Sequence, residues 1–181
     1  RTIPGPLADM PKIVVCSLAR VPDMMDAHAP AAMITLLDPA SMIDTPAPLT
    51  PDRHLRVGVN DIPDEAEGLV APGPHHVRDI ISFVDRWDQT APLLVHCWAG
   101  ISRSTATAFI AACRLNPGVS EHEIATALRA RAPSASPNPL LVGWADAALG
   151  RDGRMVAAIT AIGRGAMVWE GSPFELPVRL G

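Results

Sequence analysis

Residues 93 to 112 read LLVHCWAGISRSTATAFIAA, and the rest of the fold is arranged around this stretch. The short apolar run at 93–95 predicts a strand, and the Ala- and Thr-rich run after Arg103 predicts a helix. Between them lies a loop that begins at Cys97 and ends at Arg103. A loop that leads into a helix N-terminus points backbone N–H groups and the positive end of the helix dipole at one small space. The pattern therefore predicts an anion site.

The first residue of this loop, Cys97, has the surroundings of a nucleophile. The helix dipole and Arg103 favour a thiolate, which is the reactive form of cysteine. The planar Arg103 guanidinium can hold two anion oxygens at once, whereas without an anion a cation is disfavoured at a helix N-terminus. Taken alone, Cys97 is better explained as a buried, inert core residue, and it is the surrounding pattern that favours the nucleophile. A thiolate beside a bound phosphate is the arrangement of covalent phosphoryl transfer.

This loop resembles the signature of the protein tyrosine phosphatase superfamily. His96-Cys97, five residues and Arg103-Ser104 match the pattern H-C-x5-R-[S/T], and the fuller VHCWAGISRST is most similar to the small dual-specificity branch and related small bacterial phosphatases. The resemblance is strongest over residues 55–112 and extends loosely to Asn138. Residues from about 145 onward resemble no general part of the family, and we interpret them as a subgroup's own C-terminal extension of a single domain that covers residues 1–181.

The resemblance implies a catalytic role for four residues of this stretch. Cys97 attacks phosphorus and forms a phosphocysteine, and Arg103 binds two phosphate oxygens. His96 orients the loop, and the Ser104 hydroxyl eases departure of the thiolate when the intermediate is hydrolysed. The phosphate itself is held mainly by backbone N–H groups, with Gly100 allowing a close approach. The expected phosphate-binding residues are Trp98, Ala99, Gly100, Ile101, Ser102 and Arg103.

Phosphoryl transfer to cysteine also requires an acid, because the leaving alkoxide or phenoxide has to be protonated. In the resembled branch the acid is an aspartate on a mobile loop well before the cysteine, and Asp61 takes that place. Three acidic neighbours compete for this role, and we interpret them as a solvated loop; they are Asp64, Glu65 and Glu67. Asn138, in the run Ser-Pro-Asn-Pro, is expected to support the active-site loop, with an ordinary helix cap as the alternative.

Composition sets limits on the kind of protein. The chain has 181 residues and is 48% hydrophobic, which suits one domain with a full core. No apolar run is long enough to span a membrane, and nothing resembles a signal peptide. A net charge of −4 gives no basic footprint for nucleic acid or acidic lipid. Three widely spaced cysteines form no disulfide framework, so we expect a reducing, cytoplasmic location.

Strands and helices alternate in the first half of the sequence, and helices dominate the second. Strands are predicted at 13–16, 32–37, 55–59 and 93–95, with an edge strand at 167–170 and an extended tail around Pro173 and Pro177. Helices are predicted at 23–29, 75–88, 102–115, 120–132, 139–149 and 151–164. These patterns predict a single α/β domain with a central, mostly parallel sheet of four to five strands, flanked by helices on both faces, as in cysteine phosphatases.

The leading hypothesis is a cysteine-dependent phosphatase that acts on phosphotyrosine or other phosphoprotein monoesters. Its partner would be a phosphorylated protein or a small phosphomonoester. We expect it to bind neither nucleic acid nor a membrane. The chemistry needs no metal or other cofactor, and the adjacent His75 and His76 are expected to point apart on a helix. A catalytically silent phosphate-binding module and a rhodanese-like sulfurtransferase are the alternatives. Cys16 and Cys113 are expected in the core, and a redox partnership with Cys97 and the oligomeric state are left open.

Overall fold

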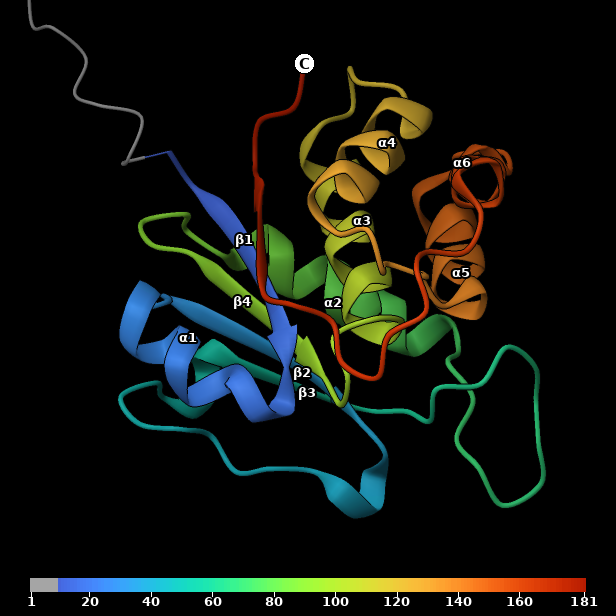
Figure 1. Ribbon diagram of the computed structural model, residues 1–181. Coiled ribbons are helices and arrows are strands. Elements are labelled where there is room, and N and C mark those ends of the chain that lie inside the picture. The colour runs from blue at the N-terminus through green and yellow to red at the C-terminus, as the bar shows by residue number, and fades with distance from the viewer. Residues whose placement is uncertain (1–9) are drawn as a thin grey trace, which may run out of the picture.

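The architecture is a five-stranded sheet with helices on both faces, in a computed structural model that describes residues 10–181 (Figure 1). The strands are β1 (Lys12–Ser17), β2 (Ala32–Leu37), β3 (His54–Gly58), β4 (Leu93–Cys97) and β5 (Phe174–Pro177). The helices are α1 (Val21–His28), α2 (Pro74–Arg86), α3 (Arg103–Leu115), α4 (Glu121–Arg131), α5 (Pro139–Leu149) and α6 (Arg154–Ile162). None of the helices within 10–181 is long and apolar enough to cross a membrane.

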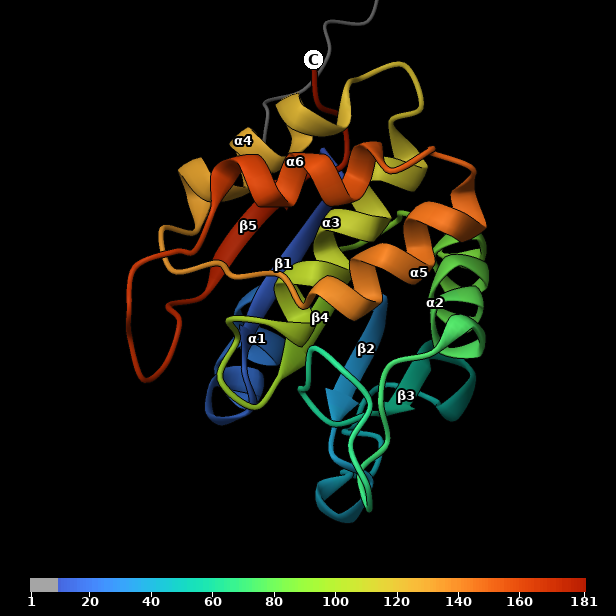
Figure 2. The same cartoon turned by 90° about the vertical axis from the view of Figure 1, so that its right-hand side faces the viewer.

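The sheet has the order β3-β2-β4-β1-β5. Its first four strands are parallel, and only β5 runs antiparallel, along the outer edge of β1. This confirms the predicted fold class of a single α/β domain around a mostly parallel sheet. The carboxyl ends of parallel strands meet at one edge of a sheet. Figure 2 shows the loops after β3 and β4 and the segment before β5 gathered at that edge.

Two apolar layers of unequal size cover the sheet. The larger layer carries α2 to α6, and the smaller one contains α1 together with Ile43 and Leu49 from the loop between β2 and β3 (Figure 1). At the centre of the larger layer, α3 is buried from Arg103 to Cys113. Its small residues, such as Ala108 and Ala111, allow the sheet and the surrounding helices to pack closely on all its sides.

The predicted edge strand at 167–170 is wrong, and the real edge strand lies in the predicted tail. Met167 and Trp169 are 91% and 100% exposed and belong to a loop. In β5, Phe174 and Leu176 are buried while Glu175 points to solvent, which is the alternation of a strand with one covered face. Pro177 is tolerated because it closes the strand at the margin of the sheet.

The expectation that His75 and His76 point apart is also wrong. Their ring centroids lie 3.7 Å from each other at the start of α2. The reason is local: His76 Nδ1 turns back toward the helix start and accepts a hydrogen bond from Gly73 N, at 2.9 Å. His76 therefore acts as part of the helix cap, and His75 packs against its ring.

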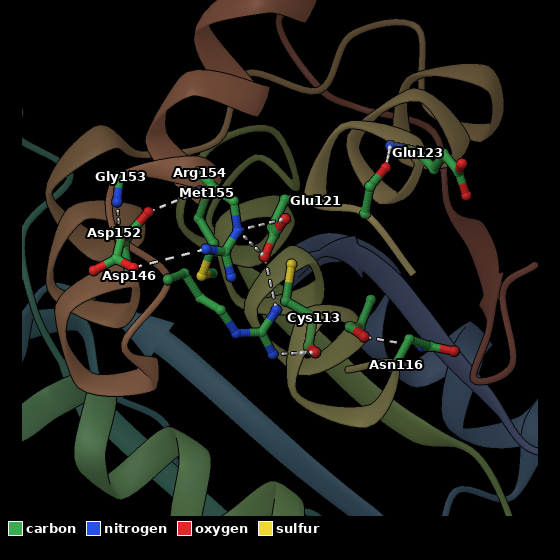
Figure 3. A network of polar contacts seen from close by, with 12 residues as sticks. Cys113, Asn116, Glu121, Glu123, Asp146, Asp152, Gly153, Arg154 and Met155 are labelled. Atoms are coloured by element: carbon green, nitrogen blue, oxygen red, sulfur yellow. Dashed lines mark hydrogen bonds and ion pairs between the residues drawn. The ribbon is translucent and has the colours of Figure 1, made fainter. Parts of the chain in front are cut away.

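A buried carboxylate holds the helical layer together through a network of polar contacts (Figure 3). Glu121, at the start of α4, accepts hydrogen bonds from Arg151 at 2.9 Å and from Arg154 at 3.2 Å. Arg151 also donates to the Cys113 carbonyl at the end of α3. Asp146 of α5 accepts from the Gly153 N–H and from the first turn of α6. These contacts fix α3, α4, α5 and α6 relative to one another, and α5 begins beside the site described next.

Candidate active site

Cys97 is the last residue of β4 and lies at the carboxyl edge of the sheet. Its side chain is only 3% exposed. The Cys97 sulfur is 3.3 Å from the Gly100 nitrogen, which donates to it, and 3.2 Å from the Ser104 hydroxyl oxygen. The loop from 97 to 103 thus curls back so that its own N–H and the first turn of α3 converge on the sulfur. This is the placement expected for Cys97 and Ser104 from the sequence.

Gly100 is required at its position for a reason that the sequence did not reveal. Its φ is +71°, a left-handed conformation that side chains rarely adopt. A Cβ there would lie 2.9 Å from backbone atoms of both Cys16 and Ser17, at the end of β1. The backbone at Gly100 therefore lies close to the backbone of the neighbouring strand β1. The cysteine loop is seated directly on the backbone of β1, which limits how far it can move.

Arg103 is buried at 5% exposure and held in one orientation by two acceptors. Its Nη1 donates to Asp38 Oδ1 and to the Val59 carbonyl, both at 2.8 Å. Its Nε is buried and has no hydrogen-bond partner within residues 10–181. A buried donor left unpaired is costly, and an anion in the loop would satisfy it. Asp38 was missed by sequence reasoning, although an acid directly after the β2 strand is a signal for this edge of a parallel sheet.

Asp61 lies in the same cavity as Cys97 and Arg103. The cavity measures about 560 Å³, and Asp38, Trp98 and Ser102 also line it. Asp61 Oδ1 accepts hydrogen bonds from the Ser102 hydroxyl at 2.7 Å and from Asn138 Nδ2 at 2.9 Å. Both bonds use one oxygen, so Oδ2 is the oxygen available to carry a proton. The competing acids are exposed and do not line this cavity; they are Asp64, Glu65 and Glu67.

Asn138 does two things at once. Its Oδ1 caps α5 by accepting from Leu141 N at 3.1 Å, while its Nδ2 donates to Asp61 and to the Ile62 carbonyl. Its backbone N–H donates to the Ser102 carbonyl at 3.2 Å. The side chain is 2% exposed. From the sequence, a helix cap and support of the active-site loop were alternatives for Asn138. In the structure Asn138 does both, and its side chain supports the loop that carries Asp61.

The segment between α6 and β5 forms one wall beside the cysteine loop. Gly171 N donates to the Ala99 carbonyl at 2.8 Å, and Glu170 shares a short hydrogen bond with the Ser17 hydroxyl. On the other side, Ser136 N donates to the Ile101 carbonyl at 2.9 Å. The expected phosphate-binding backbone of residues 98–102 is therefore bound along its length. The Trp98 side chain itself is 62% exposed at the mouth of the cavity.

His96 is fully buried next to the cysteine, and its surroundings favour the neutral imidazole. Burial lowers its pKa to about 4; the charge of Arg103 adds to this effect, and the hydrogen bond to the Cys97 carbonyl opposes it. His54, at the start of β3, has its pKa lowered to about 4 by burial, by His96 and by Arg56. Thr35 of β2 contacts both rings. Sequence reasoning missed Thr35 and His54, since no local pattern marks them.

These two histidines make stability depend on pH. Between about pH 6.5 and 4 the unfolded chain binds protons at His54 and His96 that the folded chain does not. We therefore expect the free energy of unfolding to fall as pH falls through this window, by up to about 1.4 kcal/mol per pH unit for each histidine. Urea unfolding at a series of pH values measures the slope. His54→Gln should flatten the curve, whereas the exposed control His122→Gln should follow the wild type; parallel curves for all three would contradict the expectation.

The remaining cysteines lie away from the cavity. All three thiols are free, and Cys113 is buried within α3. Cys16 lies on the strand next to Cys97 but packs into the apolar layer on the opposite face of the sheet. Burial raises the pKa of both Cys16 and Cys113 to about 12, with the charge of Cys97 adding to the effect at Cys16. Within residues 10–181, no three His, Cys, Asp or Glu side chains gather as metal ligands.

Comparison with known proteins finds similarity to dual-specificity phosphatases. No family model matches the chain. It is 36% identical over 101 residues to dual specificity protein phosphatase 15 of Rattus norvegicus, a match that covers 55% of this chain and 40% of the rat protein. The protein of the same name from Homo sapiens is 34% identical over 103 residues, which cover 55% of this chain and 32% of the human one. The match thus spans less than half of these relatives.

Solved structures share the fold. The crystal structure of DUSP15 superposes with a TM-score of 0.55 and 22% identity, covering 84% of this chain and 93% of that one. Human DUSP28 gives a TM-score of 0.55 and 21% identity over 82% of this chain and 99% of that one. The human tyrosine phosphatase-like serine/threonine/tyrosine-interacting protein gives 0.56 and 18%, over 76% of this chain and 87% of that one. The fold is that of the dual-specificity phosphatases.

Proposed function

We propose that this chain is a cysteine-dependent phosphatase that hydrolyses phosphate monoesters through a phosphocysteine intermediate. The observation that carries the proposal is that Cys97, Arg103 and Asp61 line one cavity, although Asp61 comes from a separate stretch of the chain. Sequence similarity to dual-specificity phosphatases supports it. Phosphotyrosine and other phosphorylated protein side chains are the substrates that we propose.

In the first step the Cys97 thiolate attacks phosphorus, and the bond from phosphorus to the ester oxygen breaks. Arg103 Nε and the N–H groups of the loop bind the phosphoryl oxygens, whose charge they stabilise in the transition state. Asp61 Oδ2 gives its proton to the departing oxygen, so that a neutral alcohol or phenol leaves. The two bonds from Ser102 and Asn138 to Oδ1 hold the carboxyl group in place, so that Oδ2 is the oxygen that would carry the proton.

In the second step water attacks the phosphocysteine, and the bond from sulfur to phosphorus breaks. Asp61, now ionised, accepts a proton from this water. The Ser104 hydroxyl lies 3.2 Å from the sulfur and donates to the thiolate as it leaves. His96 holds the Cys97 carbonyl and so supports the loop. Inorganic phosphate is released, and the thiolate is ready for another cycle. A reducing compartment such as the cytoplasm would keep Cys97 in this form.

We also propose that residues 1–181 act as one phosphatase domain with a C-terminal extension from about 145. Residues 1–9 lie outside the described part of the structure. In the extension, α6 packs against α4 and α5, and β5 completes the sheet beside β1. The segment between them contacts the cysteine loop through Gly171 and Glu170. The extension would thereby help to shape the entrance to the cavity.

The second candidate function is a phosphate-binding module without turnover. The likeness in fold to a phosphatase-like interacting protein is the observation that favours it. The presence of a nucleophile, a phosphate-binding arginine and an acid in one cavity favours catalysis instead. A sulfurtransferase of the rhodanese kind is the third candidate, and the placement of Asp61 and Ser104 around Cys97 supports phosphate chemistry over it.

Hydrolysis of p-nitrophenyl phosphate in reducing buffer, with chelator in place of added metal, tests the proposal directly. We expect turnover under these conditions. Binding of inorganic phosphate without turnover would instead support the silent module. Transfer of sulfur from thiosulfate to cyanide, with no phosphate release, would support the sulfurtransferase.

The assignment of the acid predicts a difference between two neighbouring aspartates. We expect Asp61→Asn to lower kcat by about 10²-fold and to remove the fall of kcat at high pH, because asparagine has no proton to give. Asparagine still accepts from Ser102 and Asn138 through its amide oxygen, so the loop should stay in place. The effect should be larger for phenyl phosphate, a poorer leaving group, than for p-nitrophenyl phosphate.

The exposed Asp64 provides the matched control for this measurement. Asp64→Asn should leave both kcat and its pH profile unchanged. If Asp64→Asn loses the high-pH fall while Asp61→Asn keeps it, the acid has been assigned to the wrong residue.

A further inference from the structure

A continuous chain of four hydrogen bonds runs from the backbone of the nucleophile to the loop before β3. His96 Nδ1 lies 3.2 Å from the Cys97 carbonyl oxygen, and His96 Nε2 lies 2.7 Å from Thr35 Oγ1. The same Thr35 oxygen lies 2.7 Å from His54 Nε2, and His54 Nδ1 lies 2.8 Å from Thr45 Oγ1. The chain crosses β4, β2 and β3 in their order within the sheet.

The central part of this chain is closed to solvent. His96 and Thr35 are 0% exposed, and His54 is 7% exposed. Thr45 is partly exposed and ends the chain at the loop between β2 and β3. Because water does not reach the central groups, each of their donors and acceptors has to be satisfied within the chain itself. This requirement determines where the protons lie.

The direction of all four bonds follows from the carbonyl at one end. The Cys97 carbonyl can only accept, so the neutral His96 has its proton on Nδ1 and a bare Nε2. Thr35 therefore donates its single proton to His96 Nε2 and has only lone pairs left for His54. His54 must then donate from Nε2, which leaves its Nδ1 bare to accept from the Thr45 hydroxyl. Each of the four hydrogen bonds therefore has only one possible donor.

We infer that Thr35 and His54 are positioning residues for the nucleophile: they hold His96 in the tautomer whose Nδ1–H binds the Cys97 carbonyl. Neither residue lines the catalytic cavity. The inference rests on the proposed phosphatase function only for its effect on rate, since the tautomer itself is a property of the folded chain.

The Cys97 carbonyl matters because it belongs to the first peptide group of the cysteine loop. Rotation of that peptide would move the sulfur and the N–H groups that follow it, and reacting groups have to be held to about half an ångström. Gly100 already fixes the middle of the loop against β1, and Ser136 and Gly171 bind its later carbonyls. The histidine chain supplies the corresponding restraint at the start of the loop, from the β2 and β3 side of the sheet.

Nitrogen NMR of imidazole-labelled protein tests the tautomer without any need for turnover. We expect one of the six histidines to show a protonated Nδ1 and a bare Nε2 that accepts a hydrogen bond, and this signal to vanish in His96→Gln. Thr35→Val removes the donor, so the His96 signals should shift toward the Nε2–H form; Thr35→Ser should restore them. A wild-type His96 with its proton on Nε2 would overturn the inference.

Kinetics with an amide pair at position 54 tests the consequence for the reaction. Glutamine places an N–H near the site of His54 Nε2, whereas asparagine places its amide nearer Nδ1 and leaves Thr35 without a donor. We expect His54→Asn and Thr35→Val to lower kcat by about ten-fold with KM changed less than about two-fold, and His54→Gln and Thr35→Ser to stay near wild type. Thermal unfolding in parallel identifies any variant that fails to fold.

Failure of the phosphatase proposal and failure of the positioning role of His54 give different results. If the wild type has no turnover but shows the predicted His96 tautomer, the phosphatase proposal fails, while the assigned series of hydrogen bonds from Cys97 to Thr45 stands. If the wild type turns over and His54→Asn and His54→Gln have equal kcat, then His54 acts only in folding and its role as a positioning residue is wrong.

Discussion

Cys97→Ser is expected to lower kcat for p-nitrophenyl phosphate by about 10⁴-fold or more, the largest effect of any single change in this chain. A serine hydroxyl is far harder to ionise than a thiol, so the same N–H groups and the same arginine cannot turn it into a comparable nucleophile. Serine is also close in size to cysteine. The loop, which is seated on β1 at Gly100 and bound to Ser104, should therefore keep its shape.

Binding distinguishes loss of the nucleophile from loss of the site. Titration calorimetry with inorganic phosphate should show Cys97→Ser binding about as tightly as the wild type, because Arg103 and the loop backbone do not depend on the sulfur. Cys113→Ser is the matched control, since this thiol is buried in α3 away from the cavity. It should keep its activity. A Cys97→Ser variant that retains a tenth of the wild-type kcat would rule out the phosphocysteine mechanism.

Arg103→Lys is expected to lower kcat/KM by about 10³-fold, although the positive charge is kept. The reason lies in how the guanidinium is used. Its Nη1 is already bound to Asp38 and to the Val59 carbonyl, and the fork still has Nε left for the phosphoryl group. A lysine has one nitrogen. Asp38 and the carbonyl would hold it, and it would have no second nitrogen to take the place of Nε at the phosphoryl group.

Arg114→Lys is the matched control on the same helix, because Arg114 is exposed and pairs with Asp85 far from the cavity. We expect it to keep the activity of the wild type.

The removal of the acid partner makes a second test: Asp38→Asn should preserve most of the binding and lower kcat less than Arg103→Lys, since the Val59 carbonyl still holds Nη1. Equal activity of Arg103→Lys and wild type would show that only charge is needed.

The elements that follow from local pattern were predicted well. The strand at 32–37 has the predicted bounds. The helix predicted at 120–132 is α4, which Ser120 caps by accepting a hydrogen bond from the N–H of Glu123. These features depend on residues within one turn or one strand of each other, so the sequence contains the whole interaction. The edge strand was predicted wrongly for the opposite reason. Apolar residues at 167–170 satisfy a local strand pattern, yet pairing with β1 selects Phe174–Pro177.

The candidate site divides in the same way. Cys97 and Arg103 bound one loop that leads into a helix, so their spacing predicted an anion site. The resemblance added a role for Ser104 at the thiolate. The hydrogen bond from Gly100 N to the sulfur came only from the structure. Asp61 was predicted to be the acid from a resemblance; it lines the cavity with Cys97 and Arg103, and its role as the acid stays a prediction. Its contacts with Ser102 and Asn138 bring together three separate segments, and no spacing in the sequence could have specified them.

The sequence by itself determined the anion loop, its cysteine and its arginine, and most of the helices, because these depend on short-range geometry and apolar periodicity. Only the tertiary structure decided that Asp38 holds Arg103, that Gly100 rests on β1, and that Thr35 and His54 reach the nucleophile through His96. The physical reason is the strand order β3-β2-β4-β1. Parallel pairing in this order brings to one edge, and into one register, residues that are far apart along the chain, and local propensities do not encode that register.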